Sequence, residues 1–415
     1  MKTDEKRAWC VLLGLSLFAR LAGLGLRALS HDESLHALYS WYWSQGLNYQ
    51  HDPMMHGPLL FHMNGLLFTF LPVTDFTARL IPALFGTGCV AMMLLYRRWL
   101  GRWGAFCAAV LISLDPGHLF YSRYLRNDIY ISLFTLLMVW AVLRYRETRR
   151  PVFLLWLSLG LALSFVCKEV CFIHGVMLGA GCVLFALIET LQKPPPSLST
   201  FFRHPLIHCA ALVLLLALPF ITGLLIPGGS WSPPGAIASD LQTRALRTGI
   251  QLIALTWLLG AAYFYWLNAW GTWIKGFVIF WFIQLVLYTT LFTHLSGGSA
   301  SGLAGSLGYW WAQHDVQRGN PDPAFYLTLL LLYTPVLLLG AGLALRRFRD
   351  FPVQFFLFWA VVHFGIYSWA GERMPWLLLH ISLPLCLLLG AVLPELFAGK
   401  GWRNRCLQGL LVLGL

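Results

Sequence analysis

Charged residues are scarce in this chain of 415 residues. Only 11% of them are Asp, Glu, Lys or Arg, whereas 58% are hydrophobic. So little charge excludes an ordinary soluble domain and is typical of a protein with many membrane spans. The net charge of +12 does not indicate nucleic acid, because basic residues in the short loops of membrane proteins mainly set topology.

Three further features are missing. The N-terminal MKTDEKR runs into an apolar segment without a small-residue cleavage site, so we expect no cleaved signal peptide. The nine cysteines lie in or beside apolar runs rather than in a spaced framework, which predicts free buried thiols instead of disulfides or a zinc site. No glycine-rich loop follows a strand-like run, so nothing indicates a nucleotide-binding fold.

Apolar runs of about 20 residues recur along the chain, and each is long enough to cross a bilayer as a helix. They predict an all-α integral membrane protein with about 12 to 13 transmembrane helices. The predicted spans are roughly 8–26, 75–96, 103–120, 128–146, 151–168, 170–190, 206–226, 250–267, 273–292, 325–345, 353–370 and 375–397, with another beginning near 406. We expect a single transmembrane domain over 1–415, truncated inside its last apolar run.

Lysine and arginine are distributed unevenly between the two ends of these spans. With the N-terminus in the cytoplasm, the cytoplasmic turns hold 19 of the 29 basic residues. This asymmetry predicts the orientation. It also places eleven of the seventeen carboxylates on the opposite, external face of a plasma or inner membrane. Charged groups near lipid are costly and usually mark function, so we expect one shared cavity at that face.

The first external loop, 27–74, is rich in acids, histidines and aromatic residues. Within it, residues 33–45 and 57–71 are each too short or too polar to span, and we expect two helices lying along the membrane surface. A second long external loop, 293–324, begins with GGSASGLAGSLG, a composition that predicts a mobile lid.

Three acids are the candidate catalytic residues. Asp32 and Glu33 directly follow the first span, where a carboxylate can accept a proton from an acceptor hydroxyl. The other interpretation of this pair is two solvated loop acids. Asp128 begins a span in SRYLRNDIY, and its alternative role is to cap that helix.

Several cations lie at the same face. Arg123 and Arg126 precede the helix that begins at Asp128, where a helix N-terminus favours anions such as phosphate. Lys168 and Arg373 are candidates for a lipid-linked phosphate. Each has an acid beside it, Glu169 and Glu372, so a purely structural ion pair is the alternative for both.

Histidines gather in the first external loop, but their spacing matches no zinc signature. One interpretation is that these histidines form hydrogen bonds to the loop backbone or to substrate hydroxyls. A bound divalent cation is the other, with Glu33, His36 and His51 as its candidate ligands.

Taken together, these motifs resemble a known group. The Asp-Glu pair in a first external loop, two interfacial helices and the element His56-Gly57-Pro58-Leu59 resemble the GT-C glycosyltransferases. The most similar members are the dolichyl-phosphate-mannose protein mannosyltransferases and the aminoarabinose transferases of lipid A. HDE, HDPMMHGPLLFH, RND, KE, QHDVQRG and AGERMPWL are also similar to membrane proteins described as flippase-activity-associated. Gly57 departs from the proline that mannosyltransferases usually have there.

The resemblance implies a GT-C bundle, a polyprenyl-phosphate-linked sugar as donor and inverting transfer outside the cytoplasm to a protein, lipid or glycan hydroxyl. It implies that Asp32 is the base, that Glu33 contacts acceptor or metal, and that Asp128 is a second site acid. Arg126, Lys168 and Arg373 would face the donor phosphate. The full set of predicted substrate contacts is His31, Asp52, His56, Arg123, Arg126, Lys168, Glu169, His314, Glu372 and Arg373.

Two alternatives to an enzyme remain open from the sequence. A flippase or transport component would bind lipid-linked sugars without chemistry, but it should carry polar residues through the midplane of several spans, and here they stop near the external ends. A catalytically silent partner that binds lipid-linked glycans has the same expected sequence features as the enzyme.

Overall fold

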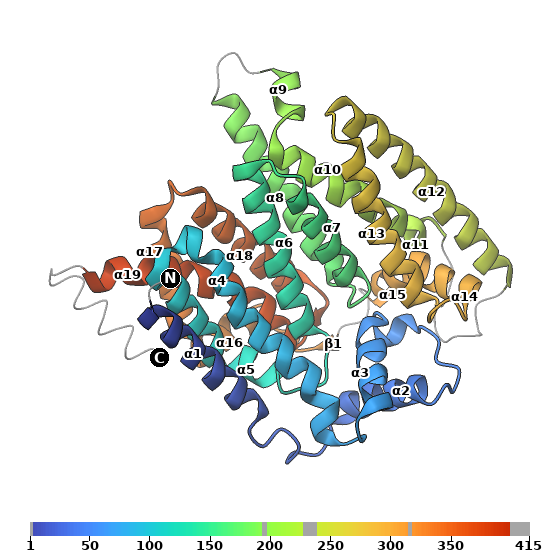
Figure 1. The fold of residues 1–415 in the computed structure, drawn as a ribbon, viewed down its shortest axis with the longest axis horizontal. Coiled ribbons are helices and arrows are strands. Elements are labelled where there is room, and N and C mark those ends of the chain that lie inside the picture. The colour runs from blue at the N-terminus through green and yellow to red at the C-terminus, as the bar shows by residue number, and fades with distance from the viewer. Residues whose placement is uncertain (1–2, 193–196, 227–238, 314–317, 399–415) are drawn as a thin grey trace. The chain divides into compact units, whose positions relative to one another are not determined.

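The chain is almost entirely helical in this computed structural model, which describes residues 3–192, 197–226, 239–313 and 318–398 (Figure 1). The helices of the first half are α1 (Thr3–Leu21), α2 (His31–Ser44), η1 (Pro53–Met55), α3 (Leu59–Phe70), α4 (Asp75–Leu114), α5 (Pro116–Tyr121), α6 (Asp128–Thr148), α7 (Val152–Phe165) and α8 (Cys171–Leu191). Those that follow are α9 (Leu198–Phe202), α10 (Pro205–Ala217), η2 (Leu218–Ile221), α11 (Thr222–Leu225), α12 (Ser239–Trp266), α13 (Trp270–Tyr288), α14 (Leu295–Ala300), η3 (Ser301–Gly305) and α15 (Ser306–Gln313). The C-terminal part comprises β1 (Arg318–Gly319), α16 (Phe325–Tyr333), α17 (Pro335–Ala344), η4 (Leu345–Arg347), α18 (Phe351–Trp369), β2 (Glu372–Arg373), η5 (Pro375–Leu377) and α19 (Leu378–Ala398).

Eight helices of the described residues are long and apolar enough to cross a membrane. A ninth span is formed if α16 and α17, which meet at an angle of 100°, are counted together. The break falls at Thr334 and Pro335, where proline has no N–H to continue the helix. The chain is therefore a multi-pass integral membrane protein, and the predicted all-α polytopic fold class is confirmed.

Each predicted span up to residue 398 corresponds to a helix, but some helices differ from the prediction in length. The predicted spans 75–96 and 103–120 are largely one helical run, α4, which is interrupted at Gly101 with a φ of 74°. Such a left-handed backbone suits glycine, so the run changes direction there. The helices α1 and α7 are too charged or too short to be counted as spans by themselves. The span expected near 406 lies outside the described residues.

The chain divides into two compact units that are each built from separate segments. The first, unit 1, comprises Met1–Ser34, Pro72–Leu136 and Val316–Leu415. The second, unit 2, comprises Leu35–Leu71 and Leu137–Asp315. Each unit therefore has its own core and is described by itself.

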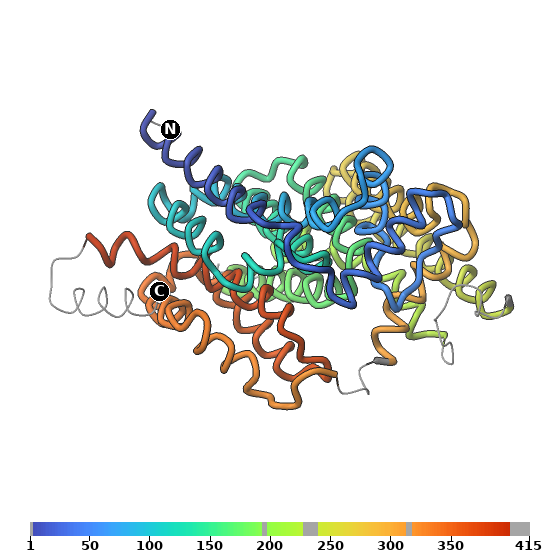
Figure 2. Tube along the Cα trace, turned by 90° about the horizontal axis from the view of Figure 1, so that it is seen from below, coloured from blue at the N-terminus to red at the C-terminus, as the bar shows by residue number. Residues whose placement is uncertain are grey.

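The core of unit 1 forms around α19, which packs against α4, α17 and α18 (Figure 2 shows α18 and α19 side by side in orange and red). Small residues let the backbones approach closely. A Cβ on Gly104 would lie 2.7 Å from the carbonyl oxygen of Gly390, and one on Gly390 would lie 2.7 Å from the Cβ of Ala108. Helices in lipid associate through such close packing, since no hydrophobic effect drives them together.

In unit 2, α13 packs against α7, and α10 packs against α8. Polar side chains of α13 tie it to the carbonyl ends of α7. The amide of Gln284 donates to the carbonyl of Ala162 at 3.0 Å, and the hydroxyl of Tyr288 donates to the carbonyl of Phe165 at 2.8 Å. The bond from Tyr288 serves the last residue of α7, where helix carbonyls lack intrahelical donors.

The predicted second external loop is helical over 295–313, and its mobility stays a prediction. Its glycines permit close packing. A Cβ on Gly298 would lie 2.2 Å from the carbonyl oxygen of Tyr288, and one on Gly305 would lie 2.7 Å from Pro53. In the first loop, the two predicted helices are present as α2 and α3.

Candidate functional site

The adjacent acids Asp32 and Glu33 lie in the first turn of α2 and point in different directions. Neighbouring positions on an α-helix are about 100° apart, so the two carboxylates cannot share one environment. The side chain of Asp32 is 37% exposed, whereas that of Glu33 is 0% exposed. The sequence pair is thus one accessible acid and one buried acid.

Glu33 is held by hydrogen bonds to both of its carboxylate oxygens. The guanidinium of Arg79 donates to them at 2.6 and 2.9 Å, and Arg27 donates at 2.9 Å. The backbone N–H groups of Ser30 and Leu125 donate at 3.0 and 3.1 Å. Burial acts to raise the pKa of this carboxyl, but these hydrogen bonds outweigh it and hold the pKa below its usual value.

Arg79 connects this carboxylate to the end of the first helix. Besides Glu33, its guanidinium donates to the backbone carbonyls of Leu24, Arg27 and Ala28 at 2.7 to 3.1 Å. Arg79 is only 1% exposed, so the whole group is desolvated. The pair therefore fixes the segment that carries Asp32 against α4.

Asp32 and Asp128 share one cation. The guanidinium of Arg126 donates to Asp32, and its Nε lies 3.3 Å from the carboxylate of Asp128. The guanidinium also lies over the ring of Trp376, 3.5 Å from the ring centre, an arrangement that favours a cation. Asp128 is 0% exposed, and Nε2 of His380 lies 3.4 Å from its other carboxylate oxygen.

The remaining predicted residues of unit 1 lie at the start of α2, in the turn before α6 and in β2. His31 is exposed at the start of α2. Arg123 donates to the carbonyl of Ala19. Glu372 and Arg373 form β2, which pairs in parallel with β1. Arg373 donates to the carbonyls of Ser368 and Pro321 at 2.9 and 2.8 Å, so its guanidinium holds this connection together.

A second group of predicted residues meets in unit 2. Nδ1 of His56 lies 2.7 Å from the carboxylate of Glu169, which is 4% exposed. Lys168 is buried in the same turn between α7 and α8. Asp52 caps η1 by accepting from the N–H of Met54 at 2.9 Å, and burial raises the pKa of its carboxyl. His314 lies outside the described residues.

The candidate metal ligands do not come together in the described part of the chain. Both ring nitrogens of His51 are engaged, with Ser301 at 2.7 Å and with the carbonyl of His56 at 3.1 Å. His36 is buried against Phe61, and both oxygens of Glu33 already accept hydrogen bonds. In the ranges that the structure describes, no three His, Cys, Asp or Glu side chains form a group that could hold a metal ion. The binding of a divalent metal ion stays a prediction.

Gly57, the departure from the expected proline, has a structural reason. Its N–H donates to the carbonyl of Cys167 at 3.2 Å, and a Cβ there would lie 2.4 Å from the carbonyl oxygen of Val166. Proline has neither the hydrogen nor the space that this contact needs. The loop before α3 thereby lies directly against the turn that carries Lys168 and Glu169.

The structure therefore divides the predicted residues into two groups. Asp32, Arg126 and Asp128 meet in unit 1, whereas His56, Lys168 and Glu169 meet in unit 2. That all of them face one cavity stays a prediction.

Sequence reasoning missed three residues of unit 1, namely Arg79, which binds Glu33, and Trp376 and His380, which contact Arg126 and Asp128. A signal existed for two of them, because Arg79 and His380 are polar residues inside apolar runs.

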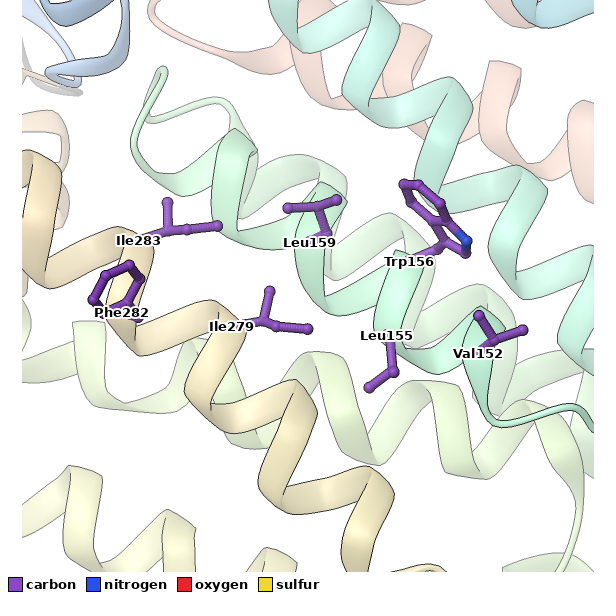
Figure 3. Close-up of a pocket in the computed structure, with 7 residues that line it drawn as sticks. All are labelled: Val152, Leu155, Trp156, Leu159, Ile279, Phe282 and Ile283. Atoms are coloured by element: carbon purple, nitrogen blue, oxygen red, sulfur yellow. The ribbon is translucent and has the colours of Figure 1, made fainter.

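An apolar recess of about 460 Å³ lies between α7 and α13 of unit 2 (Figure 3). It is lined by Val152, Leu155, Trp156, Leu159, Ile279, Phe282 and Ile283. None of these side chains is charged or accepts a hydrogen bond, so the recess suits hydrocarbon rather than a sugar.

Comparison with known proteins agrees with the sequence motifs. Residues 28–226 match the family model for dolichyl-phosphate-mannose-protein mannosyltransferase, and no curated protein matches the chain. Similar solved structures include the oligosaccharyltransferase of Archaeoglobus fulgidus in the apo form, with a TM-score of 0.60 and 16% identity over 100% of this chain and 55% of that one.

Two further structures hold ligands. The oligosaccharyltransferase AglB from Archaeoglobus fulgidus, in complex with an inhibitory peptide and a dolichol-phosphate, has a TM-score of 0.57 and 15% identity over 100% of this chain and 55% of that one. ArnT from Cupriavidus metallidurans, bound to undecaprenyl phosphate, has a TM-score of 0.50 and 13% identity over 97% of this chain and 63% of that one. The chain spans less than two thirds of each of these proteins. The predicted GT-C fold and the resemblance to the mannosyltransferases are confirmed.

Proposed function

We propose that this GT-C chain, whose residues 28–226 match the mannosyltransferase family model, is a membrane glycosyltransferase. It moves a sugar from a polyprenyl-phosphate donor to an acceptor hydroxyl, with inversion at the sugar. One observation carries the assignment of the base. Of the three acids around Arg79 and Arg126, only Asp32 has an exposed side chain that a substrate can reach.

In the transfer step, the acceptor oxygen forms a bond to the anomeric carbon while the bond from that carbon to the phosphate oxygen breaks. The proton of the acceptor hydroxyl passes to Asp32, and the electron pair of the broken bond leaves with the lipid phosphate. Arg126 contributes by holding the carboxylate of Asp32 in one orientation, since it is itself fixed by Asp128 and Trp376. Positioning of this kind supplies much of the rate enhancement in group transfer.

Glu33 and Asp128 support this step as positioning residues. Both are fully buried and hydrogen-bonded or ion-paired, so they position the segment and the cation rather than touch substrate. The departing phosphate needs positive charge, and Lys168 is the candidate that the sequence motifs give for it. Two similar structures hold dolichol-phosphate and undecaprenyl phosphate, which supports a lipid phosphate as the donor's carrier.

The direct test of the proposed function is an assay of sugar transfer. Purified protein in nanodiscs, supplied with polyprenyl-phosphate-mannose, should release polyprenyl phosphate and glycosylate a hydroxyl acceptor such as a serine- and threonine-containing peptide. Mannose is the first sugar to test because the matching family model carries that name. Donor that stays intact with peptide, lipid and glycan acceptors would contradict an enzymatic function.

Replacing Lys168 by Met should weaken donor use without preventing folding. Loss of a charge-assisted contact to phosphate typically costs about 1.5–3 kcal/mol, so the donor Kd should rise by roughly 10- to 150-fold. Lys275→Met, in the exposed part of α13, is the matched control and should leave the Kd unchanged. Equal donor affinity in both variants would remove Lys168 from the phosphate site.

We also propose that the site opens to the external face of the plasma or inner membrane. A cysteine introduced at Gln45, just after α2, should react with a membrane-impermeant reagent added to intact cells. A cysteine at Ser197, before α9, should react only after the membrane is opened. The reverse pattern would place the proposed site in the cytoplasm, where the distribution of Lys and Arg does not put it.

A further inference from the structure

The series of contacts behind the exposed acid Asp32 does not end at Arg126. Within unit 1 it continues to Asp128 and then to His380 of α19, which is 0% exposed. Nε of Arg126 lies 3.3 Å from one carboxylate oxygen of Asp128, and Nε2 of His380 lies 3.4 Å from the other. A polar residue inside an apolar helix of a membrane protein is costly and usually marks function.

The imidazole of His380 is itself held by α18. The ring of Tyr367 stacks on it, with the ring centres 5.6 Å apart and an angle of 25° between the planes. The ring of His363 in turn packs edge to face against Tyr367 at 5.6 Å, and both residues are at most 1% exposed. Side chains packed this closely cannot change rotamer freely, so Nε2 of His380 stays directed at Asp128.

The carboxylate of Asp128 is thus fixed by partners on both of its oxygens. A carboxylate oxygen only accepts hydrogen bonds, so Nε2 of His380 carries the hydrogen of this contact. A buried carboxylate is costly unless it is paired, and at 0% exposure bulk water does not replace a lost partner of Asp128. Without the imidazole, one oxygen would lose a donor, and the carboxylate that fixes Arg126 would be freer to rotate.

We propose that His380 is a positioning residue for sugar transfer, which acts through Asp128 and Arg126 on the base Asp32. This inference rests on the proposed function. His380 is fully buried, so it neither touches substrate nor takes a proton in the transfer step. It holds the carboxylate of Asp128, which holds the guanidinium of Arg126, which orients the carboxylate of Asp32. A misplacement of about 1 Å can lower a rate by about 10²-fold, so the loss of such support has a measurable effect.

Two amide side chains of different length test this role. His380→Gln places an amide N–H near the position of Nε2 and should transfer sugar at close to the wild-type rate. His380→Asn is polar as well, but its shorter amide does not reach Asp128. Single-turnover transfer from saturating polyprenyl-phosphate-mannose in nanodiscs should therefore be roughly 10- to 100-fold slower in His380→Asn. The donor Kd should be unchanged in both variants, since His380 acts on the base.

A double-variant cycle separates positioning from a general loss of structure. In the Asp32→Asn background, His380→Asn should slow transfer no further, because the carboxylate that it positions is already absent. Residues that act as one unit have non-additive effects of this kind, whereas the effects of independent residues add.

The matched control is another buried pair of histidine and aspartate in unit 1. Nδ1 of His118 lies 2.7 Å from the carboxylate of Asp115, and the two residues are 0% and 4% exposed. His118→Gln replaces this donor by an amide at the wrong distance. It should lower the Tm as His380→Asn does, yet the folded protein should transfer at close to the wild-type rate.

Three results would overturn the inference. One is a wild-type rate in His380→Asn, and another is a rate in His380→Gln that is as low as in His380→Asn. The third is an equal loss of rate from His380→Asn in the wild-type and Asp32→Asn backgrounds, which would mean that His380 acts independently of the base. All three leave the proposed function standing. A wild-type protein that transfers no sugar would instead overturn the proposed function and this inference with it.

Discussion

Replacing Asp32 by Asn should lower the rate of single-turnover sugar transfer by roughly 10²- to 10⁴-fold. The amide keeps the size of the side chain and much of its contact with Arg126, but it cannot accept the proton of the acceptor hydroxyl. Asp32 is the accessible acid of the group, with 37% of its side chain exposed, whereas Glu33 and Asp128 are fully buried. Donor affinity should change little, because the phosphate is assigned to Lys168.

The measurement is transfer in nanodiscs under single-turnover conditions, with donor Kd determined separately. Asp240→Asn is the control, since Asp240 is exposed on α12 and pairs only with the exposed Arg244 among the contacts of the described chain. A wild-type rate in Asp32→Asn would contradict its role as the base.

Replacing Glu33 by Gln should destabilise the protein strongly rather than slow the chemical step alone. Arg79 would keep its charge while only 1% exposed, and breaking a buried pair by removing one partner typically costs about 3–5 kcal/mol. Thermal unfolding in detergent, followed by circular dichroism, should show a lower Tm. Arg27→Gln removes the partner that is 47% exposed and should cost less than about 1 kcal/mol.

Two further results would support this role of Glu33. In the double variant Glu33→Gln with Arg79→Met, part of the stability should return, because no buried charge remains without its partner. The wild type should also lose stability in acid. The pKa of the Glu33 carboxyl is lowered by folding, so its contribution is complete above the usual value of 4.5 and is lost as the pH falls through the lower folded-state pKa. An unchanged Tm in Glu33→Gln would show that the pair is not needed for the fold.

The sequence by itself determined the class of the protein and the position of most of its helices. Long apolar runs must bury their backbone polar groups as helices in lipid, so the spans from α4 to α19 follow from hydropathy alone. The Asp-Glu pair, the Arg-Asn-Asp turn and the Lys-Glu turn were also identifiable, because charged residues at span ends are rare and conspicuous. Short-range patterns carry this information, and no knowledge of the fold was needed.

Only the tertiary structure decided which member of each pair faces outward. Asp32 and Glu33 are equivalent in the sequence, and the difference between them arises from Arg79, which reaches Glu33 from 46 positions away. In the same way, the predicted phosphate ligand Arg373 is engaged with backbone carbonyls, and the glycines around 298–305 permit close packing. These outcomes depend on long-range contacts and on the space left between helices, neither of which a local pattern of residues encodes.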